Sequence, residues 1–224
     1  MKFFQSLFLS PLLAGAAMAQ DPAAGLWTGE VSLSKVSEVH FRQTTGATPT
    51  DTASPFTMRV LLHVDASGNV KLLKEAILMQ TTATPPVQVI VTQPNLISNF
   101  EGIAERNGKL TGRRFSTASF PMTGDRLALT GSMAAGGSAA GTLTLAANDP
   151  VNPFRHKYHP DLANAGVAVS RAITLTIAAG DTADDHRLAG TWSESMTGLH
   201  KDAIQVSGSL TLVRVSTVAT LNNQ

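Results

Sequence analysis

The stretch RAITLTIAAG, residues 171–180, decides the fold class of this chain. Its large apolar side chains at 173, 175 and 177 alternate with threonines at 174 and 176. Successive side chains of a strand point to opposite faces, so this alternation predicts a half-buried β-strand. Threonine and isoleucine also fit well on a pleated surface.

The same pattern recurs along the chain, between segments that are typical of turns. Residues 59–78 predict a hairpin whose connection, Asp65–Asn69, contains Gly68. Asn107-Gly108 is the dipeptide that best accepts a tight type I′ hairpin turn. Residues 126–148 and 190–216 predict two more hairpins. No stretch beyond the N-terminus shows helical periodicity, so we expect an all-β fold of about ten antiparallel strands, either a sandwich or a closed or curved barrel.

The last predicted strand changes phase. Leu210 and Leu212 occupy one phase, and Val213 and Val215 occupy the other. Either a β-bulge or a strand that is buried on both faces would produce this pattern. Because bulges occur at barrel corners and strong bends, the phase change favours a curved or closed sheet.

The N-terminal 19 residues resemble a secretory signal peptide. Lys2 precedes an apolar run over residues 3–13, and Ala17-Met18-Ala19 fits the small-x-small rule for cleavage. We therefore expect residues 20–224 to form a single exported β domain, in the periplasm or the extracellular space, with no membrane span after cleavage. The chain has no cysteine, which excludes disulfides and lipidation on cysteine.

Charge composition argues against a nucleic-acid partner. The chain has 17 Lys and Arg residues against 16 Asp and Glu residues, with no long block of like charge. Binding to a phosphate backbone needs a basic surface. We expect an envelope or extracellular protein, or a glycan, as the partner.

Two segments predict long loops, at about residues 43–55 and 148–170. The second contains NPFRHKYHPD, residues 152–161, which holds two of the six histidines and the single tyrosine. Long loops in compact domains often carry function. The candidate ligand-binding residues of this loop are Arg155, His156, Tyr158, His159 and Asp161.

His156 and His159 are also candidate metal ligands, because imidazoles three residues apart can bind one ion. A zinc site needs further ligands, from His63, His186, Asp149 or Asp161. A metal-dependent hydrolase would then be one possible function. The alternative, which the residues favour, is that these side chains hydrogen-bond the backbone and fix the loop, with no cofactor bound.

Other catalytic signals are missing from the sequence. It has no G-x-S-x-G or H-E-x-x-H motif. Asp181, Asp184 and Asp185, next to His186, offer oxygen ligands for calcium, but acidic residues are also common in solvated turns. A non-catalytic module is therefore favoured over an enzyme.

Two resemblances add expectations. Gly25-Leu26-Trp27 resembles the opening of lipocalin-type barrels, which implies that Trp27 plugs one end, that Arg214 of the last strand covers it, and that the barrel holds a small apolar ligand. Residues 149–161 and the segments that follow resemble uncharacterised exported bacterial β proteins of the Verrucomicrobia–Planctomycetes kind. That second resemblance implies a β-rich exported module and no particular chemistry.

The sequence thus predicts an exported, non-catalytic β module that binds or scaffolds a partner. A lipocalin-like barrel with a small apolar ligand is the first alternative, and a metal-dependent hydrolase that uses His156 and His159 is the second.

Overall fold

A computed structural model describes residues 20–37, 48–81, 84–85, 87–93, 105–106, 109–110, 112–117, 121–155, 166–180 and 186–222. The described residues form strands, turns and loops and contain no helix, as the alternating pattern predicts. They accordingly include no helix that could cross a membrane.

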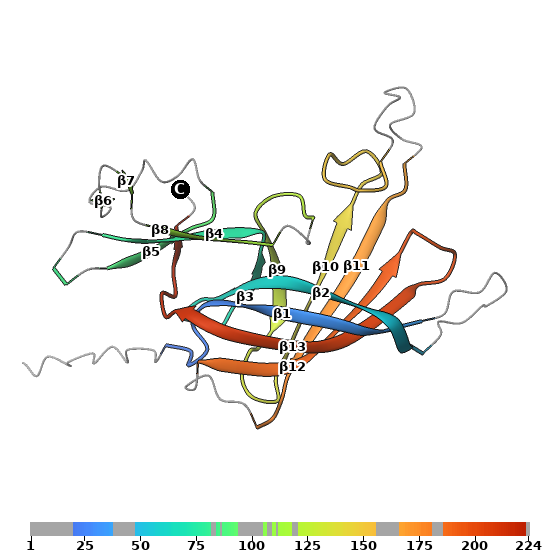
Figure 1. Ribbon diagram of the computed structural model, residues 1–224, viewed down its shortest axis with the longest axis horizontal. Helices are drawn as coiled ribbons and strands as arrows, with labels where there is room; N and C mark the ends of the chain where they lie inside the picture. The colour runs from blue at the N-terminus through green and yellow to red at the C-terminus, as the bar shows by residue number, and fades with distance from the viewer. Residues whose placement is uncertain are drawn as a thin grey trace, which may run out of the picture.

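Eight strands close into an antiparallel barrel in the order β1-β13-β12-β11-β10-β9-β3-β2 (Figure 1). Their bounds are β1 Gly25–Val36, β2 Thr50–Val64, β3 Val70–Leu73, β9 Arg126–Gly131, β10 Ser138–Leu145, β11 Val169–Ile177, β12 Arg187–Thr197 and β13 Ile204–Ser216. Each barrel strand pairs with the barrel strand that follows it in the sequence. The last of them, β13, pairs with the first, β1. The fold is therefore an up-and-down barrel and not a sandwich.

A smaller sheet combines strands from the segment between β3 and β9 with one strand, β14, that follows β13. It has the order β14-β5-β4-β8, with bounds β14 Leu221–Asn222, β5 Gln88–Val91, β4 Glu75–Gln80 and β8 Gly112–Ser116. A two-stranded sheet pairs β6 Glu105–Arg106 with β7 Lys109–Leu110. The smaller sheet lies beside the barrel (Figure 1), and a shared apolar cluster holds the two together. That cluster contains Leu26, Leu61, Leu73, Ala76, Ile90 and Phe115.

The barrel interior is filled by side chains from the inward phase of each strand. An eight-stranded barrel is just wide enough for side chains to fill it. The buried cluster inside includes Trp27, Val31, Val60, Leu62, Leu72, Ile173, Leu175, Trp192, Leu210 and Leu212, with Met122 and Met133 from the connections. The side chains of the described residues thus occupy the axis of the barrel.

Gly208 of β13 pairs with Trp192 of β12 on one side and lies close against the backbone of β1 on the other. A Cβ atom built on Gly208 would lie 1.8 Å from the carbonyl oxygen of Ser32 on β1, so any side chain there would push β1 and β13 apart. An aromatic ring beside a strand glycine covers the space that the glycine leaves. The glycine thus allows β1 and β13 to lie close together.

Trp27 closes one end of the barrel, as the lipocalin resemblance implies. Its Nε1 donates a hydrogen bond of 2.7 Å to the carbonyl oxygen of Ala23. The Arg214 guanidinium carbon lies 5.2 Å from the centre of the Trp27 ring, and Arg214 Nη1 donates to the carbonyl oxygen of Pro22 at 2.6 Å. This cation–π contact and hydrogen bond tie the last barrel strand to the segment before the first.

The strand pairing confirms the predicted hairpins. Asp65–Asn69 connects β2 to β3, with Gly68 at a φ of 83° and Asp65 Oδ1 accepting from the Asn69 amide. The β9–β10 and β12–β13 hairpins are also present. Residues 107–108, the predicted tight turn between β6 and β7, lie outside the described residues.

Of the two explanations offered for the phase change in the last strand, the β-bulge holds and burial on both faces does not, because Val213 is 46% exposed. Trp27 pairs with Arg214 while Leu26 pairs with Ser216, so Val215 is an extra residue in β13. Val215 then packs outward against the cluster beneath the smaller sheet. The bulge lets one strand line the barrel and also contribute to the second cluster.

The predicted loop at residues 43–55 is wrong over its C-terminal part. Residues 50–55 form the first part of β2, where Asp51 and Thr50 pair with Lys35 and Val36 of β1. Their side chains are mostly exposed, so the segment lacks the apolar alternation that marks a half-buried strand. Of the second predicted loop, residues 148–155 and 166–168 are described and contain no strand, and Val169 begins β11.

His63 is buried between the barrel wall and the C-terminal segment. Its side chain has no exposed surface, its Nε2 lies 3.1 Å from the carbonyl oxygen of Val218, and its Nδ1 has no partner among the described residues. Burial lowers the pKa of His63 to about 4, the hydrogen bond to Val218 opposes this effect, and nearby Lys71 adds to it. The neutral imidazole is therefore the form that the fold accommodates.

We expect this histidine to make the fold sensitive to mild acid. The unfolded chain binds a proton at His63 near pH 6.5 and the folded chain only near pH 4, so the free energy of unfolding should fall by about 3 kcal/mol between these values. Urea unfolding at pH 7.5, 5.5 and 4.0 measures this loss. His63→Gln should remove most of it, whereas His200→Gln should leave it intact; equal slopes in both variants would contradict the assignment.

Candidate functional site

The end of the barrel opposite Trp27 carries an apolar cavity of about 150 Å³. This end is formed where β10 stops at Leu145, where β11 starts at Val169 and where β12 stops at Thr197. Two prolines and five other apolar residues make up most of the wall. The lining consists of Pro121, Leu145, Pro153, Phe154, Val169, Met196 and Leu199, with Arg171 as its charged member.

The loop after β10 supplies part of this wall and is fixed by Asn152. The Asn152 side chain is buried; its Nδ2 donates to the carbonyl oxygens of Ala146 and Val167 at 2.8 Å each. Its Oδ1 accepts from the Phe154 amide at 2.9 Å. All polar atoms of this amide side chain are thus used to hold the loop in one shape, with Pro153 and Phe154 against the cavity.

Asp149 adds a second tie at the base of the same loop. Its carboxylate accepts hydrogen bonds from the Thr123 hydroxyl and, at 2.9 Å, from the Val151 amide. These bonds, that from Thr123 first, lower the pKa of Asp149, so the carboxylate stays ionised and keeps both contacts. The described part of NPFRHKYHPD therefore belongs to a loop that Asn152 and Asp149 fix, whereas the sequence interpretation assigns this role to Arg155, Tyr158 and the two histidines.

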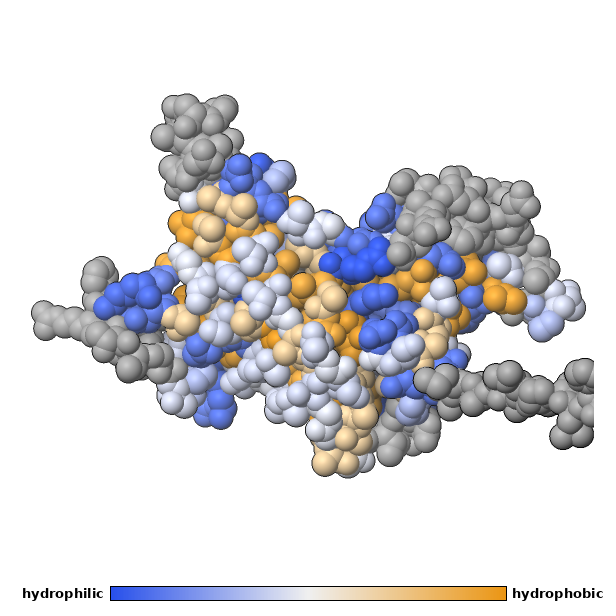
Figure 2. All heavy atoms as spheres, turned by 180° about the vertical axis from the view of Figure 1, so that it is seen from behind, coloured by the Kyte–Doolittle hydropathy of each residue, from blue (hydrophilic) through white to orange (hydrophobic). Residues whose placement is uncertain are grey.

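Apolar surface remains exposed next to the cavity. Phe154 is 48% exposed and Val167 is 40% exposed, and the Val167 amide donates to the carbonyl oxygen of Phe154 at 3.3 Å. Figure 2 shows apolar atoms on the surface at this end of the molecule. An apolar molecule that reached the cavity would therefore meet apolar surface at its entrance as well.

Arg155 is the one candidate ligand-binding residue that the structure describes. It is half-buried, its Nε has no partner among the described residues, and its amide donates to the carbonyl oxygen of Asn152 at 3.3 Å. His156, Tyr158, His159 and Asp161 lie outside the described residues, so their roles as ligands stay predictions.

The described residues supply no ready-made metal site. No group of three or more His, Asp or Glu side chains within them is close enough to hold an ion. Asp149 lies at the same end of the barrel as Arg155. His63 lies beneath the C-terminal segment, and His186 accepts from Arg214 Nε at 3.1 Å at the closed end. Asp181, Asp184 and Asp185, the candidate calcium ligands, are outside the described residues.

A buried ion pair lies in the barrel wall behind the cavity, and sequence reasoning missed it. Arg171 donates from Nε at 2.9 Å and from Nη2 at 2.8 Å to the two carboxylate oxygens of Glu194. Trp192 Nε1 also donates to Glu194 Oε1 at 2.8 Å. The Glu194 side chain is 1% exposed and that of Arg171 is 14% exposed.

The sequence did carry a signal for this pair. Arg171 is in phase with Ile173 and Leu175, and Glu194 is in phase with Trp192, so each charge occupies an inward position of its strand. Buried charges in such positions are rare unless they are paired. The alternation of inward and outward positions along these strands identifies both residues as charges at inward positions. A single sequence does not show that the two side chains face each other.

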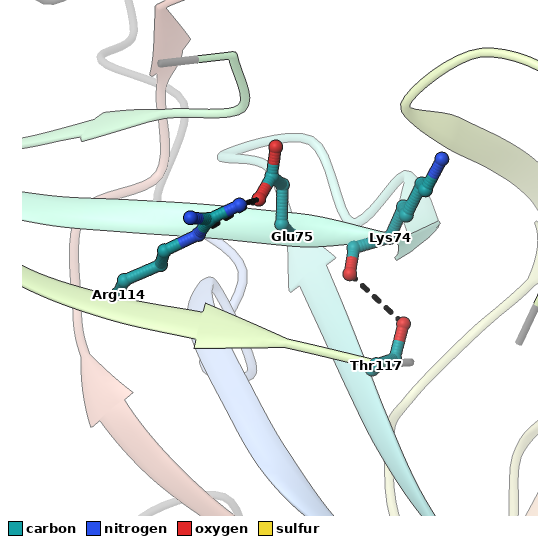
Figure 3. A network of polar contacts seen from close by, with 4 residues as sticks. All are labelled: Lys74, Glu75, Arg114 and Thr117. Atoms are coloured by element: carbon teal, nitrogen blue, oxygen red, sulfur yellow. Dashed lines mark hydrogen bonds and ion pairs between the residues drawn. The ribbon is translucent and has the colours of Figure 1, made fainter. Parts of the chain in front are cut away.

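A larger groove of about 450 Å³ lies between the smaller sheet and the loops of the barrel. Figure 3 shows its polar side: Arg114 points to Glu75, while the Lys74 side chain points away from both. Arg114 Nε donates to Glu75 Oε2 at 2.9 Å, and the Thr117 hydroxyl donates to the carbonyl oxygen of Lys74 at 2.9 Å. The Arg114 guanidinium and the Thr117 hydroxyl thus already have hydrogen-bond partners in the wall of the groove. We therefore regard the smaller apolar cavity as the better candidate for a ligand site.

No known protein family matches this chain, and no curated protein shows significant similarity to its sequence. The account of function therefore rests on the geometry of the barrel and its open end.

Proposed function

We propose that the protein is a non-catalytic binding module that holds a small apolar group at the open end of its barrel. The observation that carries this proposal is the cavity of about 150 Å³ whose lining is apolar except for Arg171. Binding sites are typically apolar concavities with a few placed polar groups. Residues 1–19 further support a place outside the cytoplasm for this activity.

The size of the cavity limits the ligand. An apolar cavity of about 150 Å³ can hold one benzene ring, so the site suits a group of about six carbon atoms. Because side chains fill the barrel below, a larger molecule would place only one end in the cavity and leave the remainder against Phe154 and Val167. This geometry favours recognition of a small molecule or of one apolar end of a larger partner.

Benzene should bind to the purified protein, and filling the cavity should prevent it. Leu199 is half-buried in the turn after β12, so Leu199→Trp can place its ring in the cavity without displacing a buried side chain. We expect the dissociation constant for benzene, measured by calorimetry, to rise at least about tenfold. Val213→Trp, on the exposed outer face of β13, is the matched control and should bind as the wild type does.

Equal binding by both variants would place the benzene elsewhere and contradict the proposal. Failure of the wild-type protein to bind benzene at concentrations near saturation would contradict it as well.

A further inference from the structure

Met196 is the methionine at the open end of the barrel. It is the last but one residue of β12 and shares the inward face of that strand with Trp192 and Glu194. Exposure rises along this face toward the open end. Trp192 and Glu194 are buried, whereas Met196 is half-buried and lines the apolar cavity. A small molecule that enters the cavity therefore reaches the Met196 side chain.

The other described methionines are shielded by the fold. Each is at most 3% exposed: Met58, Met79, Met122 and Met133. The chain also has no cysteine, so no thiol competes for an oxidant. The susceptibility of a methionine to oxidation follows its exposure. Met196 thus carries the most accessible sulfur atom in the part of the chain that the structure describes.

Resting on the proposed function, we infer that Met196 is an oxidation site that controls binding at the open end of the barrel, with a hydroperoxide as the oxidant. The sulfur lone pair forms a bond to one oxygen of hydrogen peroxide, and the O–O bond breaks. The proton of the transferred oxygen passes to the departing hydroxide, which leaves as water. The thioether is thereby oxidised to a sulfoxide, and the peroxide is reduced.

This oxidation changes the chemistry of the cavity wall. A thioether is apolar and polarisable, whereas a sulfoxide is polar and its oxygen accepts hydrogen bonds from water. An apolar ligand in the cavity would displace that water and leave the oxygen against apolar surface, which costs free energy. The reduced protein should therefore bind the apolar group and the oxidised protein should release it. Enzymatic reduction of the sulfoxide should restore binding.

The selectivity of oxidation can be tested on the unaltered protein. Trypsin cleaves after Lys and Arg, so it places each of the five described methionines in a peptide of its own, and residues 188–201 contain Met196. The protein is treated with dilute hydrogen peroxide, and the peptides are followed by mass spectrometry. We expect the added oxygen atom to appear in this peptide at least about tenfold faster than in the other peptides. Similar rates in all of them would overturn the inference.

The effect on binding is measured by calorimetry with benzene, before and after oxidation of Met196. We expect the dissociation constant to rise about tenfold and to return after treatment with methionine sulfoxide reductase. Met196→Leu replaces the sulfur by carbon, so its dissociation constant should be the same before and after peroxide. Met133→Leu makes the same change inside the barrel, away from the cavity lining, and should keep the tenfold rise.

The outcomes separate this inference from the function on which it rests. Unchanged benzene binding by wild-type protein that is oxidised at Met196, or an equal loss in peroxide-treated Met196→Leu, would overturn the role of Met196 and leave the apolar site in place. Failure of the untreated wild type to bind benzene would overturn the site itself, and with it the control by oxidation.

Discussion

Replacing Arg171 alone with methionine should lower the free energy of unfolding by about 3–5 kcal/mol, which is a large part of the stability of a typical domain. Glu194 would keep its hydrogen bond from Trp192 but would lose both bonds from the guanidinium at a site that is 1% exposed. An ionised carboxylate without its cation is among the most costly groups to bury. Urea unfolding at neutral pH measures the change.

The double variant Arg171→Met/Glu194→Gln should recover most of this loss. Replacing both members of a buried ion pair by uncharged groups of similar volume is often neutral or stabilising, because neither charge must then be desolvated. Recovery would show that the cost of the single change lies in the unpaired carboxylate. If the single variant were as stable as the wild type, the pair would not be buried as described.

Trp27→Ala should destabilise the protein to a similar extent, by about 3–5 kcal/mol, because it removes the largest side chain at the closed end of the barrel. The Trp27 ring is fully buried, contacts the Arg214 guanidinium and donates to the carbonyl oxygen of Ala23. The alanine variant would leave an empty volume inside the barrel at its closed end. The shift of the urea midpoint measures the effect.

Trp27→Phe separates the packing of the ring from its hydrogen bond. Phenylalanine keeps an aromatic plug beneath Arg214 but cannot donate to Ala23, so we expect a loss of only about 1–2 kcal/mol. Trp192 remains in both variants as a fluorescent reporter of unfolding. A loss below about 1 kcal/mol in Trp27→Ala would mean that the ring does not close the barrel in the way that its contacts indicate.

The fold class could be predicted from the sequence because its cause is local. Ile173, Leu175 and Ile177 alternate with threonines, and that period of two requires a half-buried strand wherever the chain runs. Turn residues such as Gly68 mark the hairpins for the same reason. The predicted pairing of Trp27 with Arg214 also holds, although it came from a resemblance and not from spacing.

Local alternation and turn residues do not predict that the large sheet closes into a barrel. They do not predict the second sheet either. Sandwich and barrel differ in whether β13 reaches β1, a contact between residues such as Trp27 and Arg214 that lie at opposite ends of the chain. The segment 50–55 has the sequence pattern of a loop, because its mostly exposed side chains carry no apolar period, yet its backbone pairs with β1. A strand whose side chains are exposed can pair through its backbone without any alternation of apolar residues.

The residues that line the cavity could not be predicted from the sequence. The sequence directed attention to NPFRHKYHPD for its histidines, whereas the described contribution of this stretch is Asn152, which fixes the loop, and Phe154, which lines the cavity. Neither residue is chemically unusual. A cavity is formed by residues from several strands and loops, such as Leu145, Val169 and Leu199, and no single stretch contains it.

The central claim is that the open end of the barrel binds a small apolar group. Titration of benzene into methyl-labelled protein, followed by ¹H–¹³C NMR, tests it most directly. The account predicts saturable shifts for the methyl groups of Leu145, Val169, Met196 and Leu199, with those of Val213 on the outer wall unmoved. Shifts that fail to saturate, or that spread over the surface without favouring these four residues, would contradict the claim.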